Sequence, residues 1–126
     1  MARWTTPFTS TVQSSLYFDE RTNASWFVAA DGQIWNFRVL GQRLRAFGSG
    51  WNDAVAVLPS TDGLHLFIVL SSGDVAVVKR ESSDRTEATV LVSVGATAVA
   101  AHRLTDNSIV VLDDGGQVSQ VAPSDG

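Results

Sequence analysis

Few residues in this chain have the type and spacing that catalysis requires. Asp113 and Asp114 are adjacent carboxylates that could share acid–base work or hold Ca²⁺. They stand before two glycines, where aspartate commonly stabilises a tight turn through its own backbone, so we predict a turn. His65 and His102 lie far apart in sequence, with no second histidine or glutamate at metal-ligand spacing. We therefore expect no enzyme activity, rank a hydrolase using either aspartate last, and predict no cofactor and no metal site.

Binding residues are better represented than catalytic ones. Trp51 follows Gly-Ser-Gly in an expected loop, where an exposed tryptophan could anchor a sugar or a peptide. Arg38, Arg43 and Arg45 form the densest basic cluster and could pair with acidic residues of a partner. We predict these four residues as partner or ligand contacts, against the plainer alternative of a solvated edge.

Composition excludes several classes of protein. The chain has 126 residues, 44% of them hydrophobic and 17% charged, which is typical of one folded domain. It has no cysteine, and therefore no disulfide framework, thiolate metal site or cysteine nucleophile. No stretch has the length of a signal peptide or a membrane span, so we expect a cytoplasmic protein without a membrane partner.

Charge is distributed unevenly along the chain. The net charge of −4 argues against nucleic acid as a partner. Residues 1–50 carry +2, whereas residues 51–126 carry −6. This asymmetry could orient a partner or a second copy of the same chain, although two solvated faces would also account for it.

The elements expected to position these residues are short strands joined by glycine turns. Three times an apolar run meets a turn and resumes, with the turn glycines Gly32, Gly73 and Gly116 spaced by 41 and 43 residues. Asp31-Gly32 between apolar runs predicts a hairpin with a type I′ turn. The second unit contains four expected strands: Ala54–Leu58, Leu64–Leu70, Val75–Lys79 and Ala88–Val94, with a polar loop over Arg80–Glu87. The third unit repeats the beginning of this scheme but lacks its fourth strand.

Apolar runs in these units are continuous rather than alternating. Phe67–Leu70 and Ile109–Leu112 contain no polar residue, which is typical of strands buried on both faces. A repeat of about 40–45 residues built from such strands predicts a propeller blade. The runner-up architecture is a small antiparallel β-sandwich or barrel.

The repeats resemble those of the WD-repeat and chromosome-condensation-regulator propeller families over roughly residues 15–121. Asp31-Gly32-Gln-Ile-Trp35 resembles the hairpin of WD repeats that leads to their aromatic position, and residues 92–102 resemble the start of a regulator-type repeat. The chain departs from the pattern at Ala76-Val77 and Ser119-Gln120, where Trp-Asp or Trp-Gly is expected, and no Gly-His pair opens a unit. The resemblance implies blades but no subfamily.

We therefore expect an all-β domain over residues 1–126, a partial β-propeller of about three antiparallel blades. The blades should span approximately 15–50, 51–95 and 96–121, after an N-terminal arm or strand at 1–14. Propellers close with four blades or more, so oligomerisation, a partner chain or a remainder of the chain would complete the ring. Residues 4–12 could supply the missing strand to another copy.

Two functions follow from this architecture. The resemblance implies a protein–protein interaction scaffold that works within an assembly by self-association or through a partner. The alternative is a carbohydrate-binding lectin whose propeller is completed by oligomerisation.

Overall fold

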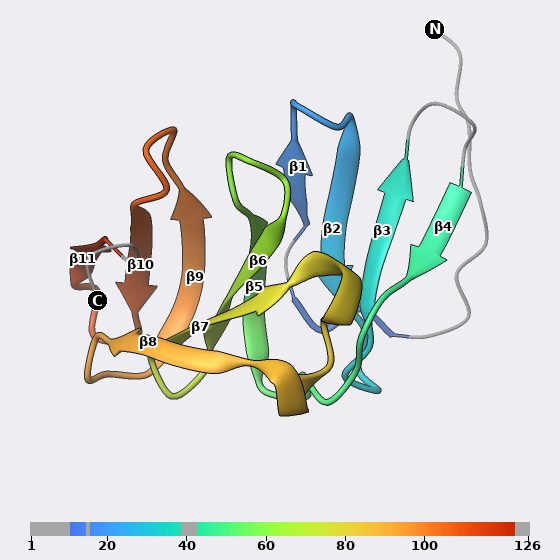
Figure 1. The fold of residues 1–126 in the computed structure, drawn as a ribbon. Coiled ribbons are helices and arrows are strands. Elements are labelled where there is room, and N and C mark those ends of the chain that lie inside the picture. The colour runs from blue at the N-terminus through green and yellow to red at the C-terminus, as the bar shows by residue number, and fades with distance from the viewer. Residues whose placement is uncertain (1–10, 15, 39–42, 123–126) are drawn as a thin grey trace, which may run out of the picture.

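A computed structural model describes residues 11–14, 16–38 and 43–122, and within them three antiparallel sheets (Figure 1). Sheet 1 contains β1 (Tyr17–Asp19), β2 (Ala24–Val28), β3 (Ile34–Arg38) and β4 (Arg43–Ala46). Sheet 2 contains β5 (Ala54–Pro59), β6 (His65–Leu70), β7 (Asp74–Lys79) and β8 (Thr89–Ser93). Sheet 3 contains β9 (Ala98–Arg103), β10 (Ile109–Asp113) and β11 (Val118–Val121).

In each sheet, consecutive strands of the chain are hydrogen-bonded neighbours. The predicted blade ranges each contain one sheet, and the third sheet has three strands where the others have four. Strand β5 lies against β1 and β2 on one side and against β9 on the other, so sheet 2 is the middle layer. Three separate sheets stacked in this way form neither a two-sheet sandwich nor a closed barrel.

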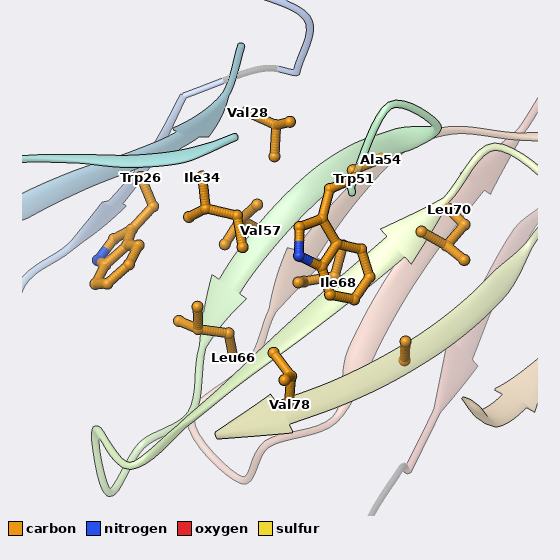
Figure 2. Close-up of a cluster of buried hydrophobic side chains, with 11 residues drawn as sticks. Trp26, Val28, Ile34, Trp51, Ala54, Val57, Leu66, Ile68, Leu70 and Val78 are labelled. Atoms are coloured by element: carbon orange, nitrogen blue, oxygen red, sulfur yellow. The ribbon is translucent and has the colours of Figure 1, made fainter. Parts of the chain in front are cut away.

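The middle sheet is buried on both faces. Leu66, Ile68 and Leu70 of β6 pack in a cluster with Trp26 and Ile34 of sheet 1 (Figure 2). The alternate residues of β6, Phe67 and Val69, pack instead with residues of sheet 3, including Ile109 and Val111. Alternation of side chains across a strand sends successive apolar residues into two different cores, which explains the uninterrupted apolar run.

The repeat glycines close the three hairpins. Gly32, Gly73 and Gly116 have φ values of +85°, +93° and +85°, a conformation that glycine adopts without steric cost. The prediction of a type I′ turn at Asp31-Gly32 is wrong, because Asp31 is not among the described residues with positive φ. Instead Ala29 N–H donates to the Gln33 carbonyl, as in the three-residue hairpin loop that a left-handed glycine completes.

Two other segments differ from the sequence-based expectation. The predicted polar loop over Arg80–Glu87 contains two single-turn 3-10 helices, η1 (Arg80–Ser82) and η2 (Arg85–Glu87). Of the residues predicted to supply a strand to another copy, residues 4–10 lie outside the described part, whereas Val12 forms a β-bridge with Ala29 of its own chain. No helix in the described part of the chain has the length and apolar character needed to cross a membrane.

The junction between sheets 2 and 3 provides a test of this packing. A Cβ added to Gly73 would overlap the carbonyl oxygen of Ala96, whereas a Cβ added to Gly116 meets no described atom within 4 Å. Both substitutions to alanine incur the left-handed cost of about 1–2 kcal/mol. We expect Gly73→Ala to lower the free energy of unfolding by about 1–3 kcal/mol more than Gly116→Ala does, as measured by urea denaturation. Equal losses in the two variants would contradict the close approach of Gly73 to Ala96.

Candidate functional site

The three arginines predicted as partner contacts line one cleft of about 420 Å³. Arg38 ends β3, and Arg43 and Arg45 lie on β4. A fourth arginine, Arg80 of η1, reaches the same cleft from the connection that follows β7 of sheet 2. We call this hollow between sheet 1 and η1 the arginine cleft.

Strand register explains why these side chains share a face. Arg38 is paired with Arg43, and Asn36 is paired with both Trp26 and Arg45. Residues directly opposite each other on neighbouring antiparallel strands point to the same side of the sheet. The arginine cleft therefore has Trp26 and Asn36 along one rung of sheet 1 and two arginines along the next.

The cleft is strongly basic. Its described lining contains four arginines and no acidic residue. Beside the cleft, the Glu81 carboxylate oxygens lie 3.7 Å from Arg45 Nη2 and 3.3 Å from Arg80 Nη2. The Arg45 guanidinium also lies 4.5 Å from the centre of the Phe47 ring, which holds the charged group over an apolar wall. One carboxylate against four guanidiniums leaves an excess of positive charge that favours anions.

Trp51 does not belong to an exposed site, and this part of the prediction is wrong. Its side chain is fully buried in the core between sheets 1 and 2 (Figure 2). The indole Nε1–H donates to the Ser83 carbonyl at 2.7 Å, and the Arg85 guanidinium lies 5.0 Å from the ring centre. Trp51 therefore fastens the β7–β8 connection to the core and offers no face for stacking a sugar. Sugar binding remains a prediction, but Trp51 can no longer be the residue that stacks the sugar.

The predicted turn at Asp113 is confirmed. Its Oδ1 atom accepts hydrogen bonds from the backbone N–H groups of Gly115 and Gln117, each at 2.9 Å. His65 lies at the start of β6 and His102 is exposed on β9, in separate sheets. No group of three or more metal-ligating side chains comes together within the described residues.

A second hollow, of about 520 Å³, lies where ends of all three sheets converge. Arg103 Nη2 of sheet 3 lies 4.0 Å from Asp19 Oδ1 of sheet 1, and both side chains are largely buried. Burial raises the pKa of Tyr17, although the Arg103 guanidinium opposes that shift. The loose, buried ion pair ties sheet 1 to sheet 3 across the end of the molecule, and we assign it a structural role.

Sequence reasoning missed Trp26, Asn36, Phe47 and Arg80, which also line the arginine cleft. Asn36 and Arg38 are separated by two positions, as residues on one face of a strand are, and this signal was available. Arg80 carried no such signal, because its place depends on how the β7–β8 connection lies against sheet 1.

No protein-family model matches the sequence, and no curated protein matches it either. Similar solved structures include dihydro-heme d1 dehydrogenase NirN in complex with DHE, with a TM-score of 0.52 and 12% identity over 89% of this chain. They also include the WD40 domain of SCAP from fission yeast, with a TM-score of 0.52 and 18% identity over 87% of this chain. This chain spans 28% of the length of each.

Identities this low show a shared fold alone. WD40 domains are propellers, and the likeness extends over nearly all of this chain. The predicted fold class is therefore confirmed: the chain is all-β, with three antiparallel sheets that correspond to part of a propeller. No particular repeat type is shown.

The contact that holds Arg85 over Trp51 gives a pH-dependent prediction. Arg85 Nη1 lies 2.6 Å from Asp53 Oδ1, and this hydrogen bond lowers the pKa of Asp53 from its ordinary 3.8. A lowered pKa in the folded state adds stability above pH 3.8 that is lost as the pH falls through the folded pKa. We expect Asp53→Asn to reduce the free energy of unfolding at pH 7 by at most about 1 kcal/mol, since the pair is partly exposed. Urea denaturation should show that difference shrinking towards pH 3, and a difference independent of pH would contradict the ion pair.

Proposed function

We propose that this chain is a protein-interaction scaffold, and that another β-sheet packs against the outer face of sheet 3. The observation that carries the proposal is an exposed apolar pair on that face. Leu112 of β10 and Val118 of β11 are directly opposite each other and are 38% and 63% exposed. On the other face of β10, Ile109 and Val111 are buried against sheet 2.

The middle sheet indicates which kind of element packs against an apolar sheet face in this fold. Both faces of sheet 2 are covered by sheets of the same kind, whereas the described residues place no sheet on the outer face of sheet 3. Strand β11 is also an edge strand, with β10 as its one described neighbour. An open apolar face beside an open edge favours association with a further β-sheet.

A second copy of the chain is the occupant that charge supports best. Residues 1–50, which include sheet 1, carry +2, and residues 96–126, which include sheet 3, carry −3, so a head-to-tail contact between sheet 3 of one copy and sheet 1 of another is electrostatically favourable. Two copies would supply six sheets, within the range of four to eight blades found in propellers. The WD40 likeness agrees with a scaffold role, because many such propellers present binding surfaces.

Light scattering after size-exclusion chromatography tests this proposal. One copy of the chain has a mass of 13.5 kDa, and we expect the wild-type chain to run as two or more copies. Leu112→Asp should shift the measured mass towards that of one copy. A carboxylate buried in the interface without a partner opposes association.

Leu64→Asp is the matched control, because Leu64 is 61% exposed but lies in the turn between β5 and β6. It should keep the wild-type mass. A folded wild-type monomer at high concentration, which also binds no partner chain, would refute the scaffold proposal.

A further inference from the structure

The arginine cleft keeps two like charges directly opposite each other. Arg38 and Arg43 are cross-strand partners on β3 and β4, and like charges in that position destabilise a sheet. Glu81 pairs with Arg45 and Arg80, and within the described part of the chain no carboxylate pairs with Arg38 or Arg43. The described residues therefore provide no carboxylate that compensates this repulsion.

The buried side of the same cleft contains an unused hydrogen-bond donor. Trp26 lines the cleft and is 2% exposed, and its indole Nε1–H is buried without an acceptor among the residues that the structure describes. Asn36, the cross-strand partner of Trp26, is 5% exposed and also lines the cleft. Buried polar groups normally have a partner, and an exception requires an explanation such as a bound ion or molecule.

One ligand chemistry would resolve both features. We infer that the arginine cleft binds the dianionic phosphate group of a small molecule. Guanidinium donors match such oxygens in geometry, and a dianion balances both Arg38 and Arg43, whereas a single carboxylate balances one. The volume of about 420 Å³ leaves room for a compact organic body beside the apolar Phe47 ring.

The difference in exposure across the cleft favours a small molecule over an acidic protein surface. Arg43 and Arg45 are exposed at the cleft, while Trp26 and Asn36, on the neighbouring strands, are almost fully buried. A compact oxyanion fits among the exposed guanidiniums, and it reaches the buried indole N–H of Trp26 when a side chain of the cleft moves aside. This site is on sheet 1 and does not depend on the packing proposed for sheet 3.

Nuclear magnetic resonance of the indole N–H groups tests the inference on the full chain. The chain has four tryptophans, and Trp26→Phe identifies the signal of Trp26. The probes are inorganic phosphate, inorganic sulfate, glucose 6-phosphate, glucose and an oligoglutamate peptide, each titrated at constant ionic strength. We expect phosphate and glucose 6-phosphate to shift the Trp26 signal saturably, with glucose 6-phosphate binding more tightly and glucose having no effect.

Arginine variants localise the binding. Arg38→Gln and Arg43→Gln should each raise the dissociation constant at least about tenfold, since each removes a charge-assisted hydrogen bond. Arg21→Gln, which changes an exposed arginine that lines the other hollow, should leave it unchanged. Arg43→Gln should also retain or raise the melting temperature without ligand, because it removes the like-charge pair. A residue with a purely structural role would lower it.

Three results would overturn the inference. The first is the absence of a saturable shift with any oxyanion. The second is equal binding by wild type and both cleft variants, which would indicate an adventitious ion only. The third is a response to oligoglutamate alone, which would assign the cleft to an acidic protein partner instead.

Discussion

Burial of sheet 2 on both faces is the constraint on which the rest of the structure depends. Strand β6 sends Leu66, Ile68 and Leu70 into one core and Phe67 and Val69 into the other, so neither core can form without it. Full burial of one such side chain contributes about 1.5–3 kcal/mol, and five of them reach the order of the net stability of a whole domain. Sheets 1 and 3 are thus held in place chiefly by the strand between them. Any surface that the outer sheets present is oriented by this layer.

On the face of sheet 1 that packs against sheet 2, the side chains change along the strands from apolar to polar and then to basic. This change creates the arginine cleft. The rung of Val28 and Ile34 is buried and apolar, and the next rung on that face pairs Trp26 with Asn36. The following rung leads to the exposed Arg38 and Arg43, and Arg80 of η1 lines the cleft with them. A basic hollow therefore opens where the apolar contact between the two sheets ends. The position of this hollow follows from where the core ends. The core does not require the positive charge of the arginines that line it.

Local patterns in the sequence were sufficient to predict most of the fold. The glycine spacing and the apolar runs predicted the strands, the three strands of sheet 3 in the described part of the chain and the two-sided burial of β6, because each is encoded within a few residues. Trp51 was misplaced because its burial depends on a contact with Ser83, 32 residues away in the chain. The arginines were identified as a cluster, yet the repulsive pairing of Arg38 with Arg43 depends on strand register. Register and the approach of distant loops are tertiary properties that a short sequence window does not contain.

The central claim is that sheet 2 stabilises both outer sheets while sheet 3 keeps one face open, and hydrogen–deuterium exchange measures this most directly. For the chain at a dilution where it is monomeric, we predict the slowest exchange in the amides of β5, β6 and β7, and much faster exchange in β11. Protection of β11 should increase when another sheet covers it. Equal protection of β6 and β11 in the monomer would contradict the account. It would mean that the stability of sheet 3 does not depend on another sheet packing against its open face.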